Sequence, residues 1–223
     1  MNKLVRLIVI FAFFFKMNRT ESTSDKSNKM QLIIEAAQKR FGIFGLEKTS
    51  MQEIADDLKL SKASLYYYFP DKENLYKAVV ETEQNEFLGR ISEKTLNINE
   101  PDLLLKEYAV SRLVYFRTLL NLSRLRLETI SDLKPVFRET IRLFKEKEKE
   151  IIIRIFTKGT EMKLFYIKDP EKTASLFLDL LKGLRVSVVS NKKTMIIDEE
   201  EYYHLYENTI AFTEIFINGL KSK

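Results

Sequence analysis

The chain of 223 residues is 45% hydrophobic and 31% charged, with a formal net charge of +5. This balance is typical of a globular protein and excludes a disordered chain. The sequence has no cysteine and a single histidine, His204, which excludes disulfides and cysteine zinc sites and argues against a histidine metal cluster. With six glycines, four prolines and long stretches rich in Leu, Ile, Lys and Glu, the chain is predicted to be all-α.

The first sixteen residues differ from the rest of the chain, because Lys3 and Arg6 precede an apolar run, Leu7–Phe15. This run is too short to cross a bilayer as a helix, which needs roughly 20 residues. A secretory signal would need a cleavage site with small residues, which does not follow. We interpret residues 1–26 as a leader and mobile arm, with translation starting at Met17. The alternative is a leader that associates with the membrane.

A first helix is predicted from apolar residues at helical spacing, with Ser27 as its N-cap and Gly42 and Gly45 at its end. The spaced residues are Met30, Ile33, Ile34, Ala37 and Phe41. A phosphate-binding loop at the two glycines is disfavoured, because no strand precedes them and no Gly-Lys-Ser follows.

The next segment, residues 50–69, has the pattern of a helix-turn-helix. Ser50 and Glu53 are spaced as a capping box, which satisfies free amides at a helix start. The small Ala55 permits a second helix to cross closely, and Leu65, ten residues later, is the expected anchor of that second helix. A turn at residues 59–61 separates the two helices, with Ser61 capping the second and Phe69 closing its far end.

If Leu65 and Phe69 face the core, then Lys62, Ala63 and Tyr66 face outward on the second helix. Such a face is expected to enter the major groove of DNA. Three consecutive tyrosines at residues 66–68 are unusual on a soluble helix, and hydroxyls that donate to phosphates would explain them. The alternative is that the tyrosines are half-buried packing residues. Residues 17–80 contain ten Lys and Arg and nine Asp and Glu, a net charge of only +1. The prediction of DNA binding therefore rests on where the polar side chains lie on the second helix, and not on the net charge.

These residues resemble the DNA-binding signature of the TetR family. The resemblance covers residues 29–80 and includes the stretches TSMQEIA at 49–55, LSKASLYYYF at 60–69 and DKENL at 71–75. It implies a homodimer that binds an inverted repeat of double-stranded DNA through N-terminal heads and a small inducer through C-terminal helical domains. The sequence departs from the family pattern at Lys59 and Ala63, where the family usually has glycine. A non-glycine residue in left-handed geometry at Lys59 costs roughly 1–2 kcal/mol.

By position, the resemblance assigns DNA contacts to named side chains. Lys62, Ala63 and Tyr66 match base-reading positions, and the phosphate-contacting positions are matched by Ser50, Gln52, Ser64, Tyr67, Tyr68 and Lys72.

Residues 73–223 are predicted to form the second, helical domain, after a helix-turn-helix domain at 27–72. A linking helix runs from Asp71 to about Glu93, and further helices follow Pro101 and Pro135. Glu148 falls on an apolar stripe, where it either lines a cavity or ends the packed region. Residues 176–189 and 202–220 are apolar on nearly every face, which indicates helices buried on several sides. A four-helix interface between two copies explains both helices, and the alternative is a thick monomeric core.

A partly apolar ligand is predicted between these helices, although the same residues are consistent with ordinary core and surface. The candidate pocket residues are Tyr108, Arg112, Tyr115, Phe116, Arg126, Phe137 and Phe144, of which Arg112 or Arg126 would meet an acidic head group. No catalytic residues, metal ligands or cofactors are predicted, because His204 lacks the orienting partner that nucleophilic catalysis needs.

The predicted function is that of a cytoplasmic DNA-binding transcriptional regulator, a repressor released from a palindromic operator by a small-molecule inducer. Two all-α regions carry it: an N-terminal three-helix helix-turn-helix head and a C-terminal helical ligand-binding and dimerisation domain. The alternative is a membrane-tethered helical adaptor or sensor without sequence-specific DNA binding.

Overall fold

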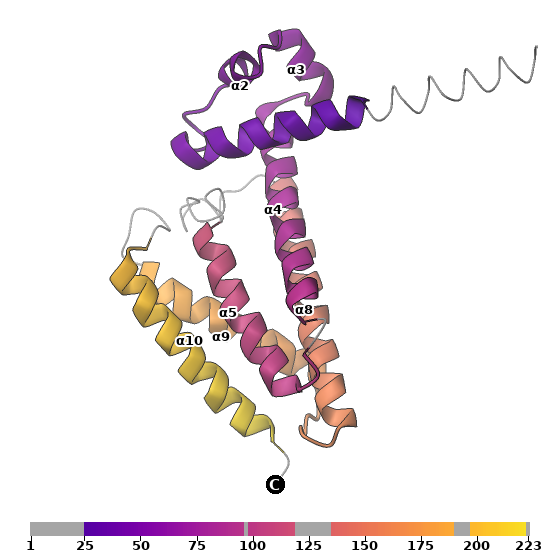
Figure 1. The fold of residues 1–223 in the computed structure, drawn as a ribbon, viewed down its shortest axis with the longest axis vertical. Helices are drawn as coiled ribbons and strands as arrows, with labels where there is room; N and C mark the ends of the chain where they lie inside the picture. Colours follow the sequence, from indigo (N-terminus) through magenta and orange to yellow (C-terminus); the bar gives the residue numbers. More distant parts are fainter. Residues whose placement is uncertain (1–24, 96–97, 119–134, 190–196, 222–223) are drawn as a thin grey trace, which may run out of the picture. The chain divides into compact units, whose positions relative to one another are not determined.

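The computed structural model describes residues 25–95, 98–118, 135–189 and 197–221 (Figure 1). Helices dominate these ranges, and the β-structure among them is one isolated bridge between Phe165 and Lys221. The all-α prediction is therefore confirmed. The leader at residues 1–16 lies outside the described residues, as does Arg126.

The chain divides into two compact units, of which the first ends at Val79 and the second begins at Val80. The first unit contains a helix over residues 25–44, α2 (Met51–Asp57), α3 (Lys62–Tyr68) and the start of α4 (Lys72–Thr95). The boundary between units therefore lies within α4, whereas the sequence-based boundary at residue 72 lies at the start of that helix.

The first helix differs from its prediction at both ends. It already includes Asp25 and Lys26, so Ser27 lies inside the helix and is not its N-cap. Gly42 is also helical, and the helix ends before Gly45, whose φ of 85° is the left-handed geometry that terminates helices. Met30 is exposed, so the buried stripe begins at Ile33 and not at Met30.

The core of the first unit forms where the apolar faces of its helices meet. Ile54 and Ala55 of α2 and Leu65 of α3 are fully buried, as the helix-turn-helix pattern predicts. Other buried members come from the first helix and the start of α4: Ile33, Ile34, Ala37, Phe41, Leu75, Tyr76 and Val79. Phe41 and Tyr76 pack edge to face, with ring centroids 5.2 Å apart. This core holds α3 in a fixed orientation from its inner side.

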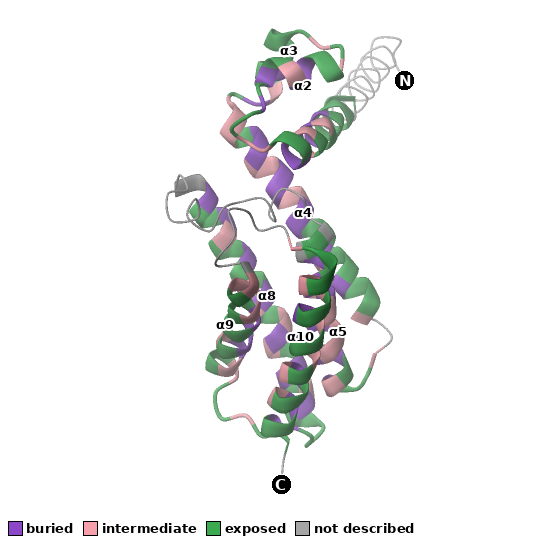
Figure 2. Cartoon of the chain, turned by 90° about the vertical axis from the view of Figure 1, so that its left-hand side faces the viewer, coloured by how far each residue is buried: buried purple, intermediate pink, exposed green. Residues whose placement is uncertain are grey.

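The second unit contains the rest of α4 together with α5 (Pro101–Thr118), α8 (Pro135–Glu161), α9 (Pro170–Val189) and α10 (Glu199–Leu220). α5 packs against α8 and α10, and α9 also packs against both α8 and α10. Each helix has a buried face and an exposed face along its length (Figure 2). The shared core is made of apolar and aromatic residues that include Phe87, Leu105, Ile152, Phe156, Phe177 and Ile217.

The turn after α8 depends on a glycine. The ring of Phe165 folds back over Gly159, so close that a Cβ on that glycine would lie 2.1 Å from the Cδ2 atom of Phe165. The amide of Tyr166 donates to the carbonyl of Leu220 at 2.7 Å, which ties this turn to the end of α10. Phe165 therefore packs the turn against α8, and the bond of Tyr166 joins the same turn to the end of α10.

Candidate nucleic-acid interface

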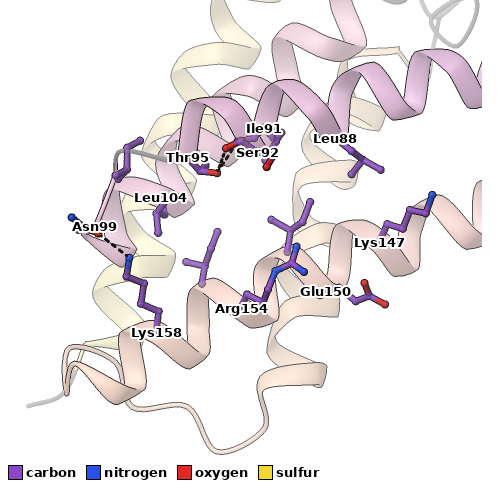
Figure 3. A pocket seen from close by; sticks show the side chains of 13 residues that line it. Leu88, Ile91, Ser92, Thr95, Asn99, Leu104, Lys147, Glu150, Arg154 and Lys158 are labelled. Atoms are coloured by element: carbon purple, nitrogen blue, oxygen red, sulfur yellow. Dashed lines mark hydrogen bonds between the residues drawn. The ribbon is translucent and has the colours of Figure 1, made fainter.

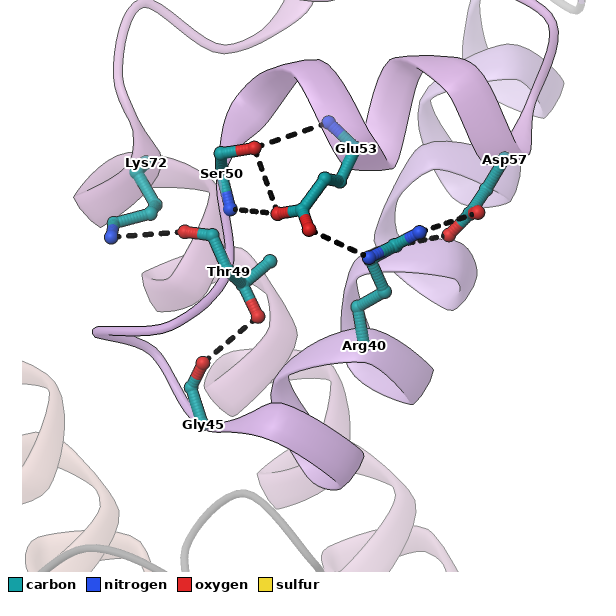
Figure 4. A network of polar contacts seen from close by, with 7 residues as sticks. All are labelled: Arg40, Gly45, Thr49, Ser50, Glu53, Asp57 and Lys72. Carbon is teal, nitrogen blue, oxygen red and sulfur yellow. Dashed lines mark hydrogen bonds and ion pairs between the residues drawn. The ribbon is translucent and has the colours of Figure 1, made fainter.

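The entrance to α2 is held by reciprocal hydrogen bonds between Ser50 and Glu53 (Figure 4). The Ser50 amide donates to Glu53 Oε2 at 2.8 Å, and the Glu53 amide donates to Ser50 Oγ at 3.3 Å. The predicted capping box is therefore confirmed. The hydrogen bonds that the Ser50 amide and hydroxyl donate to the Glu53 carboxylate, together with the charge of the nearby Arg40 guanidinium, lower the pKa of the Glu53 carboxyl.

Arg40, a residue that the sequence patterns did not single out, ties the first helix to α2. Its guanidinium donates to both Asp57 carboxylate oxygens, at 2.5 and 2.9 Å, and lies 3.4 Å from Glu53 Oε1. The hydrogen bond from Arg40 lowers the pKa of Asp57, and the same bond raises the pKa of Arg40. A bidentate arginine–carboxylate pair fixes relative orientation as well as distance, so this contact positions α2 on the first helix.

The turn between α2 and α3 takes the strained geometry expected where lysine replaces glycine. Lys59 has a φ of 53°, in the left-handed region. The amide of the next residue, Leu60, donates to the carbonyl of Ala55 at 2.9 Å, which closes the turn. Ser61 then caps α3 by accepting a hydrogen bond from the Ser64 amide at 3.1 Å. The hydrogen bonds of Leu60 and Ser61 hold the turn in this geometry, although Lys59 is not a glycine.

α3 presents one side to the core and the other to solvent. Leu65 is fully buried and Phe69 nearly so, which confirms both as anchors. Lys62, Ala63 and Tyr66, the predicted base-reading residues, are all exposed. The Lys62 ammonium lies 5.9 Å from the centroid of the Tyr66 ring, close enough for a cation–π contact. These three side chains therefore lie together on the solvent-exposed side of α3, opposite its anchors.

The three tyrosines are not equivalent. The exposed fraction is 41% for Tyr66 and 69% for Tyr67, whereas Tyr68 is half-buried and packs edge to face on Tyr67. Tyr68 thus has the geometry of the alternative interpretation, that of a packing residue. Lys26, assigned from sequence to the N-terminal arm, instead lies in the first helix with its ammonium 3.4 Å from the Tyr67 hydroxyl. This contact brings a cation to a predicted phosphate position.

The remaining predicted phosphate residues are polar but already bonded within the chain. Ser50 and Ser64 take part in the two caps, and Gln52 Nε2 donates to Asp56 Oδ1 at 2.7 Å. Lys72 Nζ donates to the carbonyls of Leu46 and Thr49 at 2.8 and 3.0 Å. An ammonium has three donors, so Lys72 retains one N–H for a phosphate while it ties α4 to the loop before α2.

In the second unit, the predicted pocket residues form a packed aromatic cluster. Tyr108, Tyr115 and Phe144 surround Phe87, with ring centroids 6.2, 4.3 and 5.8 Å from it. Phe137 is buried on α8, and the side chain of Phe116 lies outside the described part of the chain. Phe87 was missed because it lies on α4, which the sequence pattern identified only as a linker.

Glu148 lies inside this packed region, because two neighbours neutralise and bind its carboxylate. Arg112 Nε and the Tyr108 hydroxyl both donate to Glu148 Oε1, at 2.7 and 2.6 Å. Burial raises the pKa of Tyr108, and the charge of Glu148 raises that of Arg112 although burial opposes it. Burial and the charge of Arg112 lower the pKa of Arg185 to about 10. The space between Arg112 and Arg185 is a cavity of about 10 Å³, room for at most one water.

The described residues hold no cluster of three or more His, Asp or Glu side chains arranged to bind a metal ion. His204 is exposed on α10, with Glu200 4.0 Å away. Among the described helices, none combines the length and hydropathy that a membrane span requires.

Two short helices at a capped turn, with a buried anchor and an exposed polar face on the second, define a helix-turn-helix protein. The comparisons with known proteins name the family within this class. The family model described as "Bacterial regulatory proteins, tetR family" matches residues 33–79. A transcriptional regulator from Cytophaga hutchinsonii, known from its crystal structure, shares 40% sequence identity with this chain. The two structures superpose with a TM-score of 0.78, over 87% of this chain and 99% of that one. This chain belongs to the TetR family.

Two curated relatives match over a short part of the chain. The transcriptional regulator RutR of Escherichia coli is 44% identical over 54 residues, which are 24% of this chain and 26% of RutR. YuxN of Bacillus subtilis, an uncharacterized regulator of the helix-turn-helix type, is 41% identical over 70 residues, or 31% of this chain and 23% of YuxN. The chain thus spans about a quarter of the length of these relatives. All three are transcriptional regulators, which disfavours the membrane-tethered adaptor and an enzymatic role.

Proposed function

We propose that this protein is a dimeric transcriptional repressor that binds an inverted repeat and is released from it by a small molecule. The observation that carries the DNA-binding part is the exposed surface formed by Lys62, Ala63 and Tyr66 on a helix anchored by Leu65 and Phe69. Lys62 and Tyr66 have polar groups that reach base edges, and Ala63 leaves room for a close approach to the major groove. A cytoplasmic location is part of this proposal.

Phosphate contacts in the proposal come from residues around this face. Tyr67 is the strongest candidate, because its hydroxyl is exposed and the Lys26 ammonium lies next to it. Ser50, Gln52, Ser64 and Lys72 would share their hydrogen bonds with the DNA backbone. Tyr68 would contribute through its hydroxyl while its ring supports Tyr67. Such contacts set the register of the head on DNA without reading sequence.

The proposed dimer uses α9 and α10. Each helix buries one face in the core of its own unit and leaves large apolar side chains exposed on another. Leu176 and Leu180 are exposed on α9, and Tyr203 and Ile215 on α10, with an exposed fraction of 72% for Ile215. Two such faces from each of two copies would make a four-helix interface, as the apolar pattern predicts. Each dimer would then place two α3 helices in successive major grooves, about one helical turn apart.

The proposed inducer site is the region around Tyr108, Arg112, Tyr115 and Phe144. The sequence assigns Phe116, Arg126 and Phe137 to the same site. Since these described aromatic rings pack against one another, a ligand would have to displace side chains to enter. A melting temperature of the purified protein that rises with candidate ligands would support this part of the proposal.

DNA binding is tested by fluorescence anisotropy with duplexes taken from beside the coding region of the protein. Binding should require an inverted repeat and weaken steeply with salt. Lys62→Ala should change the order of preference among half-site variants, whereas Tyr67→Phe should weaken all of them alike. Lys168→Ala, which removes an exposed lysine of the second unit outside α9 and α10, is the matched control and should change neither property. An unchanged preference in Lys62→Ala would disprove the assignment of the reading face.

A further inference from the structure

A groove separates α4 from α8 within the second unit (Figure 3). It encloses about 640 Å³, within the range of small-molecule sites. Its walls come from the C-terminal half of α4, from Ile98, Asn99 and Leu104, and from residues 147–158 of α8. None of its lining residues belongs to the predicted inducer site around Arg112, so the groove is a separate feature of the unit.

Helical spacing explains why the groove has two continuous walls. On α4 the lining residues are Leu88, Ile91, Ser92 and Thr95, and on α8 they are Lys147, Glu150, Ile151, Arg154, Ile155 and Lys158. Steps of three and four residues keep each set on one face of its helix. The α8 set spans about 16 Å along the helix axis, so the groove is elongated.

The floor of the groove is apolar. Leu88 and Ile91 from α4, Ile98 and Leu104 beyond it, and Ile151 and Ile155 from α8 all contribute to its lining. Several of these side chains also pack on the hydrophobic core, which holds the floor in place. An elongated apolar floor accommodates a flexible hydrocarbon chain, because burying methylene groups is favourable at about 0.8 kcal/mol each.

The charged lining of the groove is predominantly cationic and comes from α8. Lys147, Arg154 and Lys158 stand against a single carboxylate, Glu150, a formal balance of 3 − 1 = +2. Lys158 Nζ reaches Asn99 Oδ1 at 3.4 Å, a long contact that leaves its charge available to an anion. Figure 3 shows the Arg154 side chain between α4 and α8. The groove thus pairs an apolar floor with positive charge along one side.

We propose that this groove binds a single-chain amphiphile with a carboxylate head group, a long-chain carboxylic acid. The alkyl chain lies along the apolar floor between α4 and α8, and the carboxylate contacts Arg154 and Lys147. A guanidinium binds a carboxylate with two parallel hydrogen bonds, which a neutral or cationic head group cannot form. The site is independent of the proposed inducer site, and its binding can be measured whether or not the protein binds DNA.

The test measures binding of dodecanoate to the full-length protein by isothermal titration calorimetry, below the micellar concentration. Dodecyltrimethylammonium has the same chain with a cationic head, and acetate supplies the head group alone. Lys147→Gln/Arg154→Gln removes the two cations. Ser92→Trp fills the groove from the α4 side without changing its charge. Arg138→Gln is the matched control, since Arg138 is an exposed cation of α8 outside the groove.

We expect dodecanoate to bind, and acetate and dodecyltrimethylammonium to bind at least about tenfold more weakly. Lys147→Gln/Arg154→Gln and Ser92→Trp should each weaken dodecanoate binding about tenfold, with melting temperatures close to that of the wild type. Arg138→Gln should bind like the wild type. The proposal is overturned if dodecanoate does not bind, if the cationic amphiphile binds equally well, or if the charge and groove-filling variants bind unchanged.

Discussion

Replacing Glu148 with glutamine should destabilise the second unit more than any surface charge change. The Glu148 side chain is 4% exposed and that of its partner Arg112 is 11% exposed, so the substitution leaves a buried guanidinium without its carboxylate. Removal of one partner from a buried ion pair costs about 3–5 kcal/mol. The Tyr108 hydroxyl, which donates to the same carboxylate oxygen, also loses a charged acceptor. Arg185, whose pKa the charge of Arg112 lowers, adds a further unfavourable cation.

Urea unfolding followed by circular dichroism measures this loss, and a thermal melt should show a decrease of about 6–20 °C in midpoint. The triple variant Tyr108→Phe/Arg112→Met/Glu148→Leu removes both charges together with the buried hydroxyl that Glu148 binds. It should recover most of the stability, because well-packed apolar side chains replace a buried ion pair at little cost and no buried donor is left without its acceptor. Glu146→Gln is the surface control, since its pair with Lys149 is exposed to solvent and screened, and its loss should leave the unfolding midpoint close to that of the wild type. A loss below about 1 kcal/mol in Glu148→Gln would refute the reasoning.

Three further predictions concern the turns and the acid sensitivity of the head. Lys59→Gly should stabilise the protein by about 0.5–1 kcal/mol, because relief of left-handed strain exceeds the entropy cost of glycine; a lower urea midpoint would contradict this. Gly159→Ala should destabilise by about 1–3 kcal/mol, since the new methyl group meets the Phe165 ring; an unchanged thermal midpoint would show that the turn yields. The pKa values of Glu53 and Asp57 are lowered by folding, so the unfolded chain binds more protons in acid and their contribution is lost as pH falls below about 4. A Glu53→Gln/Asp57→Asn variant should therefore show a flatter dependence of stability on pH between about 5 and 2, and an identical dependence would disprove it.

The features that the sequence determined by itself are those made by residues close together in the chain. The capping box of Ser50 and Glu53, the cap at Ser61 and the turn at Lys59 depend on hydrogen bonds between residues three to five positions apart. The exposed face of α3 followed from helical spacing once Leu65 was identified as the anchor. Local hydrogen bonds and a fixed helical period are the same in any fold, so short patterns were sufficient to predict them.

The tertiary structure decided the features in which distant segments meet. Arg40 pairs with Asp57 across 17 positions, and Lys26 reaches Tyr67 across 41. Nothing near Glu148 in sequence indicates that Tyr108, 40 positions earlier, supplies its hydrogen bond. Likewise, the lysines and arginine on α8 form one wall of a groove only because α4 lies opposite them. The role of such charged and aromatic side chains depends on which residues pack against them. The arrangement of the helices in space determines those neighbours.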